Sequence, residues 1–171
     1  MLNDGYAEHI VKTRTPGSVI AVMVLGLFIS MLGVLTILTT RWGFSFILLG
    51  AVIFFFAFSR RETEFEYLMV NEDIEVAKVI AKRSRKKMFS FSNSEVRYIV
   101  RPDSIYLDNE LRASGNTQIK TRDYTSKDED EKENVYVFVI NRNGITEFVY
   151  LELSDRTVEH VNNFFKGKYK E

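Results

Sequence analysis

The sequence predicts an α+β membrane protein: an N-terminal two-helix transmembrane hairpin, followed by a mainly antiparallel β domain that ends in a C-terminal α-helix. The first observation is the charge distribution, because one of the 46 charged residues lies in residues 16–59 and 41 lie in residues 60–171. The second is an apolar period of two through most of the later block, and the third is a helical apolar period near its end. The absence of cysteine excludes disulfide scaffolds, thiolate metal sites and cysteine nucleophiles.

Two uncharged runs form the predicted hairpin at 15–59, with helices at about 16–39 and 43–59. Residues 18–38 hold 13 Leu, Ile, Val or Phe, each of which favours insertion by about 0.3–0.6 kcal/mol. The second run has 18 residues, or about 27 Å of helix, close to the hydrocarbon thickness. The short connection between them requires an antiparallel pair. Two buried helices of a soluble domain are the alternative, but neither run keeps a polar stripe.

Cations near the helix ends predict the orientation. Lys12 and Arg14 precede the first helix, Arg60 and Arg61 follow the second, and the connecting turn has only Arg41. The positive-inside rule then places both termini in the cytoplasm, so that residues 1–14 form a cytosolic N-terminal segment and residues 60–171 a cytosolic domain. The expected location is the cell membrane, with the chain crossing it more than once.

Small residues recur at heptad spacing in both helices and are candidates for helix packing, because they let two helices approach closely. Chance is the alternative, since glycine is common in membrane helices, and the same stripes could serve a homo-oligomer. The candidates are Gly26, Ser30 and Gly33 in the first helix, and Gly43, Gly50 and Ala57 in the second.

The block after residue 61 alternates apolar and polar residues, as half-buried strands do. Residues 135–140 (VYVFVI) are apolar on both faces and are expected at the centre of a sheet, joined to 145–153 by an Asn-Gly turn. Residues 103–113 fit either a short helix or a hairpin. An amphipathic helix is expected at 155–166. The other expected strands are 63–70, 74–82, 88–91, 96–100 and 119–125.

Four stretches carry a resemblance to a known family: 6–12 (YAEHIVK), 64–67 (EFEY), 77–83 (AKVIAKR) and 122–126 (RDYTS). Together they resemble an uncharacterised family of small membrane proteins from Gram-positive bacteria. The resemblance implies two N-terminal transmembrane helices and a cytosolic pleckstrin-homology-like (PH-like) domain. It implies no activity and no catalytic residues. The chain departs from the family pattern at Glu72 and Lys127, where glycine is usual.

No spacing in the chain indicates catalysis, a metal or a cofactor. Of the two histidines, His160 is expected to face solvent on the last helix and His9 to lie at the headgroup level. Asp123 is expected to make a surface ion pair or a turn contact. The acidic run at 127–133 is expected to be a solvated loop.

A basic run at 82–87 is the candidate membrane-surface contact, formed by Lys82, Arg83, Arg85, Lys86 and Lys87. Because the two preceding strands run out and back, this run should return toward the bilayer and meet anionic lipid headgroups. A solvated hairpin end is the equal alternative. Nucleic acid is not expected as a partner, because residues 60–171 hold 20 cations and 21 acids.

The sequence therefore favours a membrane-anchored, non-enzymatic module. Its PH-like domain would bind a protein partner or the bilayer surface, and the chain could form a homo-oligomer. The alternative is an accessory or structural subunit of a membrane complex of the transporter or secretion type. A membrane-associated enzyme is the least favoured class, because no catalytic constellation is recognisable.

Overall fold

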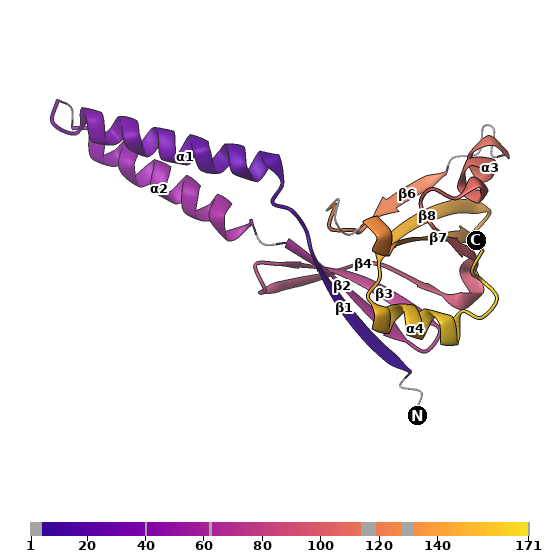
Figure 1. The fold of residues 1–171 in the computed structure, drawn as a ribbon. Helices are drawn as coiled ribbons and strands as arrows, with labels where there is room; N and C mark the ends of the chain where they lie inside the picture. Colours follow the sequence, from indigo (N-terminus) through magenta and orange to yellow (C-terminus); the bar gives the residue numbers. More distant parts are fainter. Residues whose placement is uncertain (1–4, 40, 62, 114–118, 128–131, 171) are drawn as a thin grey trace. The chain divides into compact units, whose positions relative to one another are not determined.

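The computed structural model describes residues 5–39, 41–61, 63–113, 119–127 and 132–170 (Figure 1). The chain divides into two compact units. The helical unit contains residues 14–63 together with residues 80–84. The β unit contains the remaining three stretches, Met1–Thr13, Glu64–Val79 and Arg85–Glu171. The N-terminal segment therefore groups with the later part of the chain and not with the helices that follow it.

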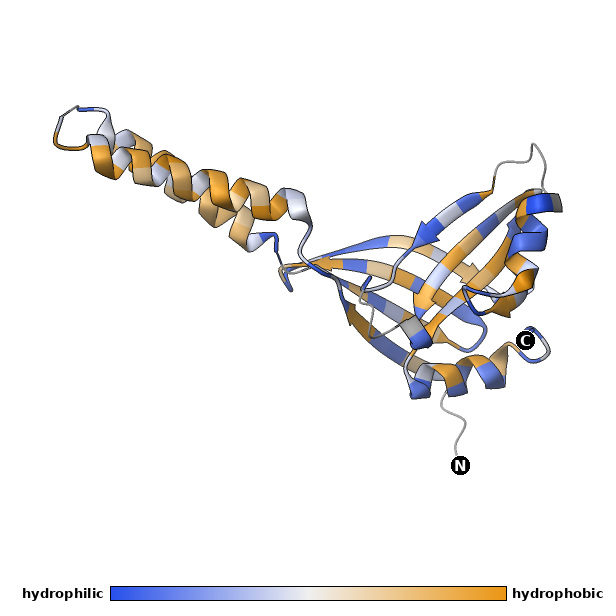
Figure 2. Ribbon diagram, turned by 45° about the horizontal axis from the view of Figure 1, so that its top comes forward, coloured by the Kyte–Doolittle hydropathy of each residue, from blue (hydrophilic) through white to orange (hydrophobic). Residues whose placement is uncertain are grey.

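The helical unit is a pair of antiparallel helices, α1 (Gly17–Thr36) and α2 (Gly43–Ser59). Large apolar side chains cover the outside of both, so the ribbon is apolar over most of its length (Figure 2). α1 ends three residues before the predicted position. The Thr36 hydroxyl donates to the carbonyl of Leu32 at 2.9 Å, and the Thr36 carbonyl accepts from the backbone N–H of Thr39. The bond from Thr39 spans three residues instead of the four of an α-helix, so the α-helical pattern ends here.

One helix of the described chain, α1, is long and apolar enough to cross a membrane by length and composition. α2 is also free of charge but has 17 residues. The two ends of this unit are tied by a hydrogen bond from the Thr15 hydroxyl to the carbonyl of Arg61, at 3.3 Å.

The β unit contains two four-stranded sheets. Sheet 1 has the order β1-β2-β3-β4, formed by Tyr6–Lys12, Thr63–Val70, Asp73–Ile80 and Ser84–Ser92. Sheet 2 has the order β5-β7-β8-β6, formed by Val96–Val100, Val135–Arg142, Ile145–Glu152 and Lys120–Asp123. Two helices, α3 (Ile105–Ala113) and α4 (Asp155–Phe164), and two 3-10 turns, Asn93–Glu95 and Lys132–Asn134, complete the unit.

The described part of the expected N-terminal segment, residues 1–14, contributes a strand to the β unit. Tyr6–Lys12 forms β1, an edge strand that pairs antiparallel with β2 from Tyr6 opposite Val70 to Lys12 opposite Glu64. Only Ala7 and Val11 of this strand are buried apolar residues. Two such positions are too few for a period-two pattern to stand out in the sequence.

The central hairpin of sheet 2 matches the sequence prediction. β7 lies between β5 and β8, and its residues Val137–Ile140 are all buried. The turn is two residues long, because Asn143 and Gly144 take φ values of 54° and 78°, which is the geometry that an Asn-Gly pair provides. Within the described part of sheet 2, β6 pairs parallel with β8. Lys127, at a position where glycine is usual, adopts φ 62° and so keeps the left-handed geometry.

The core lies between the two sheets and is closed by α4, which contributes Val161 and Phe165 to the same cluster as Tyr67 and Phe138. α4 ends at Phe164 rather than at 166. Residues 103–113 contain a helix rather than a hairpin. Leu107 of α3 is buried against the opposite face of sheet 2, where Val137 and Phe148 form a second cluster. Sheet 2 is therefore covered on both faces.

Candidate functional site

The basic run lies on the turn between β3 and β4 and on the start of β4. Ala81 and Lys82 both have positive φ, 52° and 54°, and the backbone N–H of Arg83 donates to the carbonyl of Ile80 at 3.1 Å. This is a tight two-residue turn of the kind that fits the twist of a hairpin. The expected strands 74–82 and 88–91 are thus corrected to Asp73–Ile80 and Ser84–Ser92, because the turn precedes Ser84 and most of the run is in a strand.

The five cations divide into two groups. Arg85 pairs with Glu66 of β2 at 2.9 Å and Lys87 pairs with Glu75 of β3 at 2.7 Å, so both are neutralised within sheet 1. Lys82, Arg83 and Lys86 are exposed. None of these three has an ion pair with a carboxylate of the residues that the structure describes. The charge available to an anionic surface is therefore that of Lys82, Arg83 and Lys86.

Residues 80–84 group with α1 and α2 in the helical unit. Lys82 and Arg83 thus belong to the same compact unit as Arg14, Arg60 and Arg61, the cations at the open end of the helix pair. The equal lengths of β2 and β3, eight residues each, explain this placement. A strand that runs out from Thr63 and returns over the same rise brings the turn back to the level of Thr63.

The structure brings the helix-packing candidates together along the contact between α1 and α2. The buried residues of the two helices are Gly26, Gly33, Gly43, Gly50 and Ala57. A Cβ atom at Gly26 would lie 2.8 Å from the backbone nitrogen of Phe54, and one at Gly33 would lie 2.6 Å from that of Ile47. The Ser30 hydroxyl donates to the carbonyl of Ile47 at 3.3 Å. The backbones approach so closely that a side chain larger than hydrogen has no room at either glycine.

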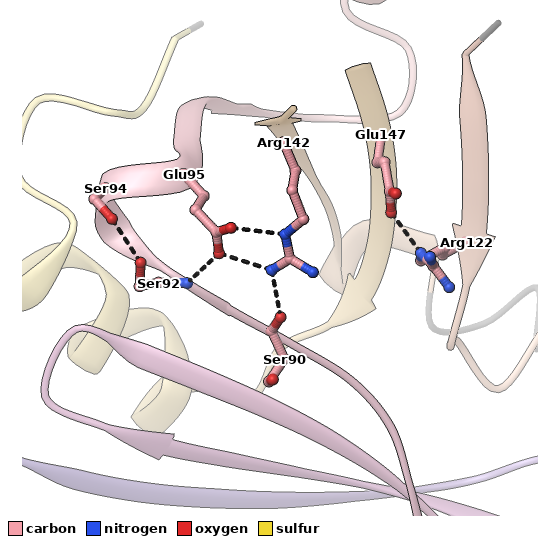
Figure 3. Close-up of polar contacts among 7 residues, drawn as sticks. All are labelled: Ser90, Ser92, Ser94, Glu95, Arg122, Arg142 and Glu147. Atoms are coloured by element: carbon pink, nitrogen blue, oxygen red, sulfur yellow. Dashed lines mark hydrogen bonds and ion pairs between the residues drawn. The ribbon is translucent and has the colours of Figure 1, made fainter. Parts of the chain in front are cut away.

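Two arginine–glutamate pairs lie next to β4, and one of them, Arg142 with Glu95, also bonds sheet 2 to sheet 1 through Ser90 (Figure 3). Arg142 donates to both carboxylate oxygens of Glu95, at 2.7 and 2.8 Å, and to the carbonyl of Ser90. Arg122 donates to Glu147 at 2.6 Å. The guanidinium carbons of Arg122 and Arg142 lie 4.2 and 5.0 Å from the centre of the Phe89 ring, an arrangement that adds cation–π attraction.

In each pair the hydrogen bonds stabilise the charged form of the side chains. The hydrogen bonds from Arg142 lower the pKa of Glu95, and those bonds in turn raise the pKa of Arg142. The bond to Glu147 likewise raises the pKa of Arg122. Two carboxylates face two guanidiniums at hydrogen-bond distance, so no net charge is left for a ligand. We describe this cluster as a latch between sheet 1 and sheet 2.

The sequence did not reveal the latch, because Glu95 and Arg142 are 47 residues apart. The one local signal is Glu147, a charged residue in the apolar strand 145–153 that the structure buries. Asp123 makes the turn contact that was expected: its Oδ1 accepts from the backbone N–H and the hydroxyl of Thr125, at 3.0 and 2.8 Å.

The expectation that His160 faces solvent is wrong, whereas the expected place of His9 at the headgroup level stays a prediction. His160 is 4% exposed, its Nε2 lies 2.9 Å from the Asn71 carbonyl, and its ring stacks on Phe164. His9 is part of β1, with its ring 6.0 Å from that of Tyr67. Among the described residues no group of three or more His, Cys, Asp or Glu could hold a metal ion. The expected acidic loop lies mostly at 128–131, outside the described residues.

A family model described as "Bacterial PH-like domain (DUF6106)" matches residues 3–171. The chain belongs to this bacterial PH-like family. The match supports the PH-like resemblance seen in the sequence, and two mainly antiparallel sheets with a C-terminal helix fit such a domain. The chain has no match among the curated proteins or among the solved structures. The family description carries no activity.

Proposed function

We propose that this protein is a membrane-anchored, non-enzymatic module of a Gram-positive cell membrane. In this proposal α1 and α2 cross the bilayer as a hairpin with both termini in the cytoplasm, and the PH-like domain is held against the anionic cytoplasmic leaflet. The observation that carries the proposal is the basic turn, because Lys82 and Arg83 belong to the compact unit of the helices and no described carboxylate neutralises them.

The outer surface of the helix pair supports the anchor. Most of the large side chains of α1 and α2 are exposed and apolar, including Phe28, Leu35, Phe55 and Phe56. A soluble monomer rarely exposes so large a continuous apolar surface, whereas lipid chains solvate it without cost. α2 is short, but Trp42 before it and Arg60 after it are residues that prefer the two membrane interfaces.

The energetics favour docking of the turn. A cation near an anionic leaflet gains about 1 kcal/mol, so Lys82 and Arg83 together contribute about 2 kcal/mol, roughly a 30-fold shift in the docking equilibrium. Arg85 and Lys87 contribute less, because moving either onto lipid first breaks its ion pair in sheet 1. The proposal therefore distinguishes two pairs of cations that are adjacent in sequence.

The test uses the full chain in nanodiscs, since a fragment that starts at residue 62 would lack β1. An environment-sensitive dye on Ser84→Cys reports whether the turn contacts lipid. We expect a lipid-contact signal in discs with anionic lipid, a weaker signal as salt rises, and little signal in neutral discs.

Two matched double variants sharpen this test. Lys82→Gln with Arg83→Gln should abolish most of the signal, and Arg85→Gln with Lys87→Gln removes the same charge but should keep it. Equal loss in the two variants would show that only net charge matters, and an equal signal in neutral discs would exclude headgroup recognition.

A further inference from the structure

A groove of about 660 Å³ lies on the outer face of sheet 2, beside the loop that leads into α3. Its apolar part is formed by Pro102, Val135 and Tyr150. Val135 and Tyr150 come from the adjacent antiparallel strands β7 and β8. α3 covers the neighbouring part of this face, over the cluster around Leu107, and the groove lies beside it.

The charged groups that line the groove are mainly acidic. Asp103, Asp123 and Glu133 face one cation, Arg101. The Arg101 guanidinium already donates to the backbone carbonyls of Glu133 and Val135, and it lies 4.0 Å from the centre of the Tyr136 ring. Both of these bonds come from Nη1, and among the residues that the structure describes no ion pair joins Arg101 to the three carboxylates.

The two carboxylate oxygens of Asp123 are held to different extents. Its Oδ1 is fixed by the two hydrogen bonds from Thr125. Its Oδ2 is approached at 3.8 Å by Lys127, whose side chain is 71% exposed, a pairing that solvent weakens strongly. Burial first, and then the charge of Asp123, raise the pKa of Tyr150, so the phenol stays protonated beside the carboxylate.

We infer that this groove binds an extended segment of a protein partner that carries cationic side chains alternating with apolar ones. The cations would meet Asp103, Asp123 and Glu133, and the apolar side chains would cover Val135 and Tyr150. An anionic lipid surface or a nucleic acid is excluded as the occupant, because the lining carries three carboxylates. The basic turn would thus bind anionic groups, whereas this groove would bind cationic ones. The inference about the groove does not depend on the role proposed for the turn.

The test measures binding of a blocked pentapeptide of alternating arginine and valine to the full chain in a neutral maltoside detergent, by calorimetry against empty micelles. Asp103→Asn with Asp123→Asn should weaken binding at least fivefold. Asn keeps the oxygen that accepts from Thr125, so the fold should be retained. Glu72→Gln with Glu159→Gln removes the same charge from exposed positions outside the groove and should leave binding unchanged.

Two further peptides and one variant test the apolar part. An arginine–serine pentapeptide should bind at least threefold more weakly than the arginine–valine peptide, and a glutamate–valine peptide should not bind. Val135→Thr, which keeps the shape of the side chain, should reduce this preference for valine. The inference is overturned if the unaltered chain does not bind the arginine–valine peptide, if the two double variants weaken binding equally, or if the serine peptide binds as tightly as the valine peptide.

Discussion

The two compact units bury opposite kinds of residue. In the helical unit the buried positions are Gly26, Gly33, Gly43, Gly50 and Ala57, the smallest side chains present, and most of the large apolar side chains face outward. In the β unit the fully buried side chains include many large ones, among them Tyr67, Phe138 and Phe165. Water drives large apolar groups inward, whereas helices in lipid associate through close backbone contact. The proposed membrane anchor accounts for this difference, because it gives the helical unit lipid as its solvent and leaves the β unit in water.

The largest expected difference in stability is between the alanine variants of two phenylalanines, one in each unit. Phe138 is 0% exposed in the β unit and Phe55 is 68% exposed on α2. Phe138→Ala should lower the free energy of unfolding of the β unit by about 3–5 kcal/mol. Phe55→Ala should change the stability of the chain in neutral detergent by less than about 0.5 kcal/mol. Denaturant titration followed by tyrosine fluorescence and circular dichroism measures both, and equal costs would remove the contrast.

Substitution of two glycines of α1 by leucine tests whether the close contact between α1 and α2 stabilises the helix pair. Gly33→Leu should destabilise the helix pair by about 1–3 kcal/mol through overpacking, since even a Cβ would lie 2.6 Å from the backbone nitrogen of Ile47. Gly17→Leu is the matched control, because nothing lies within 4 Å of a Cβ built there. Titration of mixed micelles with dodecyl sulfate compares the two. If Gly33→Leu is as mild as Gly17→Leu, the close contact does not hold in solution.

The latch should make the β unit sensitive to acid. The pKa of Glu95 is lowered by its bonds to Arg142, so the stabilisation is present above the ordinary value of 4.5 and is lost as the pH falls through the lowered folded value. At pH 7 Glu95→Gln should cost about 1 kcal/mol, since both partners are partly solvated. Below pH 4 the variant and the unaltered chain should converge in thermal melts. A constant gap down to pH 2 would contradict this role.

A smaller pH effect is expected from His160. Nε2–H donates to the Asn71 carbonyl and Nδ1 is buried without a partner among the described residues, so protonation would create a buried N–H with no acceptor. Burial lowers the pKa of His160 below its ordinary 6.5, and the unfolded chain then binds more protons. Stability should therefore fall as the pH drops below 6.5 in the unaltered chain, and His160→Gln should not show this slope. An identical slope in both would assign it to other groups.

The sequence predicts those features whose cause is local. Heptad spacing placed Gly26 and Gly50 on the contact between the helices, and the doubly apolar run 135–140 predicted the central strand. The pattern of the last helix does not reveal that His160 is buried, because the buried residues of α4 are Thr157, His160 and Val161, two of which are polar. His160 is buried because it contacts the carbonyl of Asn71 and the ring of Phe164. Asn71 is 89 residues away in the chain, so the sequence does not show the first of these contacts.

For the basic run at 82–87, the sequence predicts its place in the hairpin but not which of its cations form ion pairs. A period of two and a turn at 71–73 were enough to return the basic run to the level of Thr63. Which cations stay unpaired depends on Glu66 and Glu75, on two neighbouring strands of the same sheet. Pairing across strands follows from the register, which a single sequence does not specify at this hairpin.

The central claim, that the outward apolar surface of α1 and α2 faces lipid with both termini in the cytoplasm, is tested most directly by labelling single cysteines in intact cells. The chain has no cysteine of its own, so each label reports one position. Thr39→Cys should react with an impermeant maleimide from outside, Ser94→Cys only after permeabilisation, and Val24→Cys in neither case. Reaction of Ser94→Cys from outside, or of Val24→Cys in either condition, would contradict the claim.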